Sequence, residues 1–192
     1  MYQKNVFLKF MDYDFDIEVD KDIVDEFLKY PYLIKKLHEW VRNPNPALEP
    51  YLRQLEVIVD RLYKFKTVDI FRGIRTKSIF SRNNQLGLDE PRRIVHIKPG
   101  YVFRHECSRP TSFSLDIEIP KHFGDTIVKT KLPKKNRLVI TDELMYCVFL
   151  YRKANKKLGT TFALRQKEVV VYNHEQLLLE IVQTDNKQLP KI

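Results

Sequence analysis

Two polar side chains at the start of one predicted strand could act together on a ligand. In "LRQKEVVVY", residues 164–172, Gln166 and Glu168 are two residues apart. In an extended chain such residues project to the same side, while Lys167 points to the other side. A carboxylate can stabilise developing positive charge, and a neutral amide can both donate and accept hydrogen bonds. The simpler interpretation of the pair is a solvated strand edge.

An arginine and two serines occupy other predicted strands. Arg72 lies in "IFRGIR", inside an apolar strand, where a buried guanidinium needs an anionic or a carbonyl partner to offset its desolvation. "RPTSFSLDIEI" begins a strand with Ser112 and Ser114 on one face and Phe113 on the other. Taken singly, a structural ion pair explains the arginine, and hydroxyls that cap a turn explain the serines.

Together, the three patterns are similar to a known family. An aromatic-Arg-Gly turn, a Ser-x-Ser strand start and a Gln-x-Glu strand start, in this order, resemble the arginine-serine-glutamate class of mono-ADP-ribosyltransferases. The resemblance covers roughly residues 67–175, and "KPGYVFRHECSRPTSFSLD" also resembles the approach to the second motif. Phe113 departs from the pattern, because the family often has Thr between the serines. The helices before residue 67 resemble the helical lobe of bacterial and phage members.

The resemblance implies that NAD is the co-substrate and that no metal is required. ADP-ribose transfer breaks the bond between nicotinamide and ribose through an oxocarbenium-like transition state, as in glycoside cleavage. Glu168 would hold the ribose and stabilise that charge, and Arg72 would bind the pyrophosphate or the adjoining ribose. The backbone of Gly73 would hold the nicotinamide amide, where a side chain would crowd the ring. The remaining donor-side roles are orientation of Glu168 by Ser112, support by Ser114 and stacking of nicotinamide on Phe123.

The acceptor side follows from the residue two before the glutamate. In the family, Glu at that position accompanies arginine acceptors, whereas Gln accompanies asparagine acceptors or, in some toxins, guanine bases. Gln166 would therefore read an amide or a nucleobase edge. Phe162, Arg165 and Lys167, in and after "NKKLGTTFAL", would contact the acceptor, with Phe162 stacking on a base or packing on a protein.

Local patterns predict helices first and strands afterwards. Three helices are expected: one capped by Asp20 and interrupted at Pro31, one over "YLIKKLHEWVRN", and one capped by Asn45 with Pro46 as its first residue. Strands are expected in "NVFLKF", "TVDIFRGIR", "RRIVHI", "SFSLDIEI", "TIVKTKL", "RLVI", "EVVVY" and "QLLLEIVQ", with one helix capped by Asp142 among them. We therefore expect an α+β fold: N-terminal helices packed on a mostly antiparallel, split β-sheet core of ADP-ribosyltransferase type.

Length predicts a single domain over residues 1–192, with a helical lobe at 1–66 and a β-rich NAD-binding core at 67–192. The lobe contains 11 Lys and Arg against 12 Asp and Glu, and the core contains 23 against 13. The surplus in the core favours polyanions. Its members are Lys129, Lys131, Lys134, Lys135, Arg137, Arg152, Lys153, Lys156, Lys157, Arg165 and Lys167, among others.

Several other classes of protein do not fit. The chain has no Walker loop, GxGxxG, GxSxG or HExxH, and its five histidines are scattered. Cys107 and Cys147 are expected as reduced thiols, and the absence of a signal peptide or long apolar run predicts a cytoplasmic protein without membrane contact.

The expected function is transfer of ADP-ribose to nucleic acid, as a toxin or phage effector with an acidic antitoxin as a possible partner. Transfer to a host protein, NAD hydrolysis and a non-catalytic basic nucleic-acid-binding protein are the alternatives.

Overall fold

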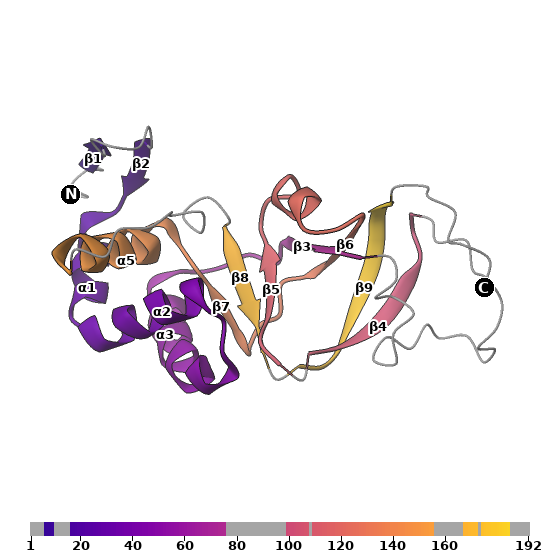
Figure 1. Cartoon of the computed structure of the whole chain (residues 1–192), viewed down its shortest axis with the longest axis horizontal. Helices are drawn as coiled ribbons and strands as arrows, with labels where there is room; N and C mark the ends of the chain where they lie inside the picture. The colour runs from indigo at the N-terminus through magenta and orange to yellow at the C-terminus, as the bar shows by residue number, and fades with distance from the viewer. Residues whose placement is uncertain are drawn as a thin grey trace. The chain divides into compact units, whose positions relative to one another are not determined.

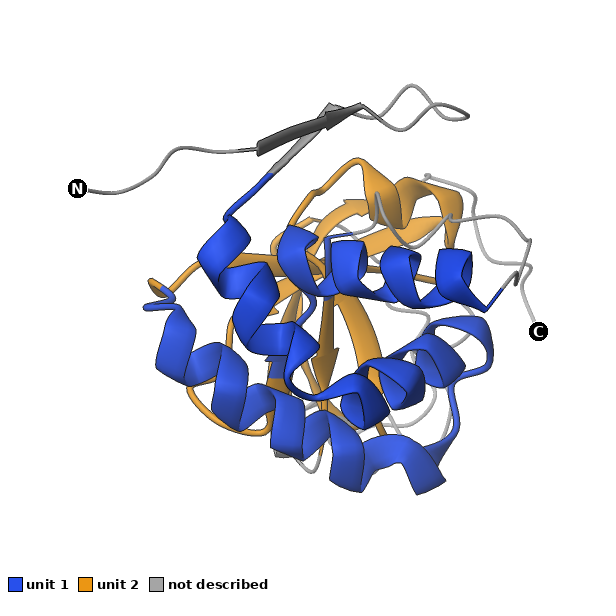
Figure 2. Cartoon of the chain, turned by 90° about the vertical axis from the view of Figure 1, so that its left-hand side faces the viewer, with its two compact units in different colours: residues 1–65, 138–168 blue, residues 66–137, 169–192 orange. Residues whose placement is uncertain are grey.

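The structure is a computed structural model, and it describes residues 6–9, 16–75, 99–107, 109–155, 167–172 and 174–184. The chain forms two compact units (Figure 2). Unit 1 contains residues 1–65 and 138–168, and unit 2 contains residues 66–137 and 169–192. Unit 1 includes the helices α1, α2, α3 and α5, and unit 2 is built mainly of strands (Figures 1 and 2).

The first two helices begin and end where local signals predict. α1 (Lys21–Leu28) is capped by Asp20, whose carboxylate accepts from the backbone N–H of Asp22 at 2.9 Å and of Ile23 at 3.3 Å. α2 (Pro31–Arg42) starts at the proline, which has no N–H to lose in the first turn. The predicted cap and the predicted interruption are both confirmed.

The third helix starts later than predicted. Asn45 does act as a cap, since its side chain accepts from the N–H of Ala47 at 2.9 Å. The turn that it caps is the 3₁₀ helix η1 (Pro46–Leu48), and α3 (Glu49–Leu62) follows it. Helix starts often tighten in this way.

The fourth helix packs against the first two within unit 1. α5 (Asp142–Ala154) contacts α1 and α2, and Cys147 on it is buried. Its cap is Thr141, which accepts from the N–H of Leu144, so the prediction of Asp142 as cap was wrong by one residue. Tyr63 donates to the carboxylate of Glu143, and this bond ties the end of α3 to the start of α5.

Seven strands form one sheet in the order β4-β9-β6-β3-β5-β8-β7, and a separate antiparallel pair joins β1 and β2. The strands are β1 (Val6–Lys9), β2 (Asp16–Val19), β3 (Asp69–Ile74), β4 (Val102–Cys107), β5 (Thr111–Ser114), β6 (Thr126–Lys131), β7 (Arg137–Val139), β8 (Glu168–Val171) and β9 (His174–Thr184). The sheet is antiparallel, and the α+β class is therefore confirmed.

Two predictions about strands were wrong, and a third lies outside the described residues. "SFSLDIEI" is a strand only as far as Ser114; a turn follows, and then the 3₁₀ helix η2 (Ile119–His122). Pro120 and the hydrogen bond from Asp116 N–H to Ser114 Oγ (3.0 Å) favour that turn over a continued strand. β4 was not predicted, because its alternation is short and interrupted by charge. "RRIVHI" is the segment outside the described residues.

Candidate functional site

Arg72 on β3 has a carbonyl partner on the neighbouring strand. Its Nη1 donates to the backbone oxygen of Ser112 at 2.6 Å, and its guanidinium lies over the ring of Phe113 at 5.9 Å from the centroid. Burial lowers the pKa of Arg72 from its ordinary value, because desolvation penalises the charged form. The prediction that this guanidinium needs an anionic or carbonyl partner is confirmed, and the partner is a carbonyl.

The register between β3 and β5 decides which side chains share a face. Phe71 is opposite Ser114, so Arg72 is next to Phe113, and both side chains lie on the same face of the sheet. Because strand residues alternate, Ser112 and Ser114 are on the face of Phe71. The first two motifs are thus joined through a backbone carbonyl of Ser112, with the two hydroxyls on the opposite face.

Gly73, directly after Arg72, is where β3 comes closest to the segment around η2. A Cβ at Gly73 would lie 2.1 Å from the carbonyl oxygen of Pro120 and 3.1 Å from the amide nitrogen of Gly124. The need for glycine at this position therefore has a cause within the chain, independent of any nicotinamide ring. Phe123, at the end of η2, is 59% exposed, which leaves its ring accessible for stacking.

Cys107 at the end of β4 is a neighbour of the Arg72 guanidinium that sequence reasoning did not place there. Burial raises the pKa of its thiol, and a hydrogen bond with Thr111 and the charge of Arg72 oppose that rise. The thiol is thus held neutral beside the guanidinium and adds no negative charge to balance it. No pattern within the sequence links residues 72 and 107, since only the fold brings them together.

Glu168 is the first residue of β8, and only 9% of its surface is exposed. Its backbone carbonyl accepts from the N–H of Ile140 at 2.9 Å, in the same unit. In the sheet β8 follows β5, which follows β3. The residues that meet in unit 2 are Arg72, Gly73 and Ser112, together with Phe113, whereas Glu168 is assigned to unit 1.

The chain before Glu168 is not extended. Lys167 has a φ of 43°, in the left-handed region, and its side chain is exposed. The expectation that residues 166 and 168 project together rested on an extended chain through Lys167, and that premise was wrong. Gln166, Phe162 and Arg165 lie outside the described residues.

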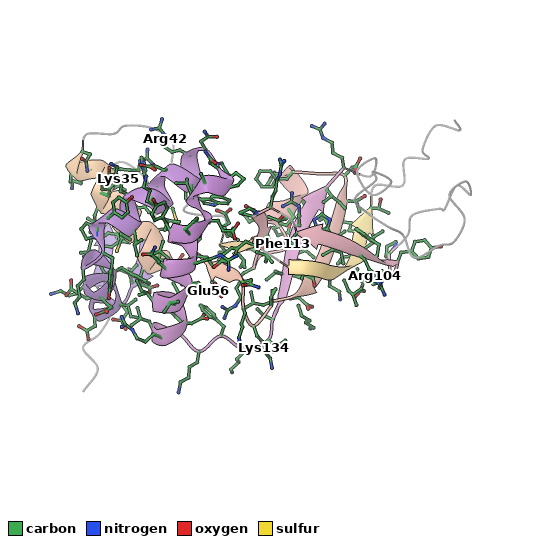
Figure 3. The ribbon with its side chains drawn as sticks, turned by 90° about the horizontal axis from the view of Figure 1, so that it is seen from below. Lys35, Arg42, Glu56, Arg104, Phe113 and Lys134 are labelled. Carbon is green, nitrogen blue, oxygen red and sulfur yellow. The ribbon has the colours of Figure 1, made fainter. Side chains whose placement is uncertain are left out.

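Part of the predicted basic surface is already neutralised or buried. Lys129 pairs with Glu180 at 3.2 Å, Lys131 pairs with Asp69 at 2.7 Å, and Arg137 is buried. Three predicted members remain exposed at two places: Lys134 and Lys135 in the turn after β6, and Lys153 near the end of α5. Figure 3 labels Lys134 on that turn. Lys156 and Lys157 lie outside the described residues, as does Arg165.

Unit 1 contains an open hollow that sequence analysis did not identify. It has a volume of about 390 Å³, and its lining combines one buried histidine with charged and amide side chains at the end of α2. The lining residues are His38, Glu39, Arg42, Asn43, Asn45 and Leu48. Figure 3 labels Arg42 at this helix end.

Comparison with known proteins adds no relative. No family model matches the chain, and searches of curated proteins and of solved structures found no match. Within the described ranges, no helix is both long and apolar enough to cross a membrane. Among the same residues, no three His, Cys, Asp or Glu side chains gather in a group suited to a metal ion.

Proposed function

We propose that this chain is a mono-ADP-ribosyltransferase that takes ADP-ribose from NAD. The observation that carries the proposal is the strand order β3-β5-β8. These three strands carry the arginine, the serines and the glutamate of the three motifs, although Arg72, Ser112 and Glu168 are far apart in sequence. The bond from Arg72 to the carbonyl of Ser112 supports it further, because it joins the first two motifs directly.

Each residue has a role that its chemistry suits. Arg72 binds the pyrophosphate: a guanidinium has five N–H groups, so the bond to Ser112 leaves others to meet phosphate oxygens. Glu168 stabilises positive charge on the ribose as the bond from C1′ to the nicotinamide nitrogen breaks and its electron pair leaves with nicotinamide. The acceptor then forms a bond to C1′ and loses a proton. Ser112 orients Glu168, and Ser114 supports it.

The acceptor in this proposal is a nucleic acid, contacted by Gln166, Phe162, Arg165 and Lys167. The exposed Lys134 and Lys135 and the excess of positive charge in residues 67–192 support a polyanionic acceptor. A host protein side chain is the alternative acceptor. An intracellular role as a toxin or phage effector, restrained by an acidic antitoxin, belongs to the same proposal.

The test is transfer of label from NAD that is radiolabelled in its adenylate phosphate. The purified chain, its Glu168→Gln variant and a Glu180→Gln control are each incubated with labelled NAD and a host cell extract. Glu180 is also on the sheet, where it pairs with Lys129, so the control makes the same chemical change away from the motifs. We expect at least a 100-fold loss of transfer for Glu168→Gln, the size typical of losing one stabilising group, and less than a twofold change for Glu180→Gln.

Treatment of the products separates the acceptors. Label that nuclease removes indicates nucleic acid, and label that protease removes indicates a host protein. Nicotinamide release at the same rate without any extract would indicate an NAD hydrolase. No label and no nicotinamide would refute the transferase and favour a basic nucleic-acid-binding protein, as would full transfer by Glu168→Gln.

A further inference from the structure

Two glycines bring two backbone segments into direct contact in unit 2. A Cβ at Gly73 on β3 would lie 2.1 Å from Pro120 O, and a Cβ at Gly124 would lie 2.4 Å from both the N and the O of Ile74. Neither glycine has a left-handed φ, in contrast to Gly100, whose φ is 89°. Space, and not backbone conformation, therefore requires glycine at both positions.

The contact involves the hydrogen bond that closes η2. Pro120 O, which faces Gly73, also accepts from the N–H of Phe123 at 2.9 Å. Figure 1 shows η2 as the short coil next to β3 and β5, and both strands contact it. The same carbonyl thus lies against the residue after Arg72 and holds the backbone of Phe123.

The exposure of Phe123 suggests what this contact is for. Its ring is 59% exposed, although neighbouring Pro120 is buried and the backbone on both sides is held against β3. Arg72, one residue before Gly73, is a desolvated cation. A rigid turn thus presents an accessible aromatic ring from the segment that is clamped next to this cation.

We propose that Gly73 and Gly124 form a backbone clamp that sets the position of Phe123 relative to Arg72, and that Gly124 is a positioning residue for NAD. The inference rests on the proposed function for the identity of the ligand. A planar ring of NAD would stack on Phe123 while Arg72 binds a phosphate. A methyl group at Gly124 would have to open the contact with Ile74 from 2.4 Å to at least 3.0 Å, which moves the turn that carries the ring.

The experiment measures the Kd of NAD by titration calorimetry, and the urea midpoint of unfolding, on the full chain. The variants are Gly124→Ala, Phe123→Leu, their combination, and Gly100→Ala as the matched control. A Cβ at Gly100 meets nothing within 4 Å, so this control strains the backbone without moving η2. We expect Gly124→Ala and Phe123→Leu each to weaken NAD binding about tenfold, with Gly100→Ala within about twofold of the unchanged chain.

The double variant distinguishes positioning from general damage. If Gly124 acts through Phe123, the combination binds NAD no more weakly than Phe123→Leu alone; additive losses would overturn the inference. Unchanged binding by Gly124→Ala would also overturn it. If Gly124→Ala does not fold, Pro120→Ala provides the test, because it keeps the carbonyl but releases the ring that stiffens the turn; binding equal to that of the unchanged chain would refute the clamp. Absence of NAD binding by the unchanged chain would overturn the proposed function, and this inference with it.

Discussion

Replacing Arg72 by lysine should destabilise the protein, even though the positive charge is kept. The guanidinium donates to Ser112 O at 2.6 Å and lies over the Phe113 ring at 5.9 Å. A hydrogen bond from a charged donor contributes about 1.5–3 kcal/mol, and a partly desolvated cation–π contact contributes about 0.5–2 kcal/mol. The two share one group and do not add, so we expect a loss of about 2 kcal/mol in the free energy of unfolding.

Replacing Arg72 by methionine separates stability from binding. Lysine retains a buried charge with a poorer fit, whereas methionine removes the charge and fills a similar volume. Burial lowers the pKa of Arg72, which shows that the charged form is penalised at this position. We therefore expect Arg72→Met to cost less stability than Arg72→Lys, and both variants to lose NAD transfer.

Urea denaturation followed by far-UV circular dichroism measures these differences. Arg104→Lys is the matched control, because Arg104 is an exposed arginine on β4 of the same unit. Figure 3 labels Arg104 on its strand and Phe113 on β5. The control should stay within about 0.5 kcal/mol of the unchanged chain. An Arg72→Lys variant as stable as Arg104→Lys would show that the contact with Ser112 does not stabilise the sheet, and would refute the reasoning.

Two more predictions concern unit 1. Burial, then the bond to Glu143, raise the pKa of Tyr63, so its contribution to stability is present below about pH 10 and is lost as the pH rises further. In Tyr63→Phe, the free energy of unfolding, followed by the fluorescence of buried Trp40, should fall less steeply between about pH 9 and pH 11; an equal slope would contradict this cause. Lys167 has a φ of 43°, so Lys167→Gly should be more stable than Lys167→Ala by about 1 kcal/mol, the reverse of the usual order, and urea denaturation of the two variants would expose a wrong sign.

Local chemistry predicted the helices well because caps and prolines act within a few residues. Asp20 and Asn45 cap the turns that follow them, and Pro31 begins a helix as expected. The errors have local causes too: Thr141 outcompetes Asp142 as a cap, and Pro120 with the Ser114 hydroxyl ends a strand that the apolar pattern would have continued.

The candidate site was predictable in its residue types and less so in its contacts. Burial of Arg72 in an apolar strand implied a partner, but anionic and carbonyl partners satisfy a guanidinium alike. The choice of Ser112 O depends on the register between β3 and β5, which pairs residues about forty positions apart. For Glu168, the extended pattern failed at Lys167, because a left-handed residue interrupts the alternation before the strand begins.

The amino-acid sequence by itself determined where helices begin, which strands carry the arginine, the serines and the glutamate, and that basic charge is concentrated after residue 66. These properties depend on neighbours in the chain or on composition. Tertiary structure alone decided the order β3-β5-β8, the neutralisation of Lys129 and Lys131, and the approach of Pro120 O to Gly73. Each of these depends on strand pairing or on packing between distant segments, which local propensities do not specify.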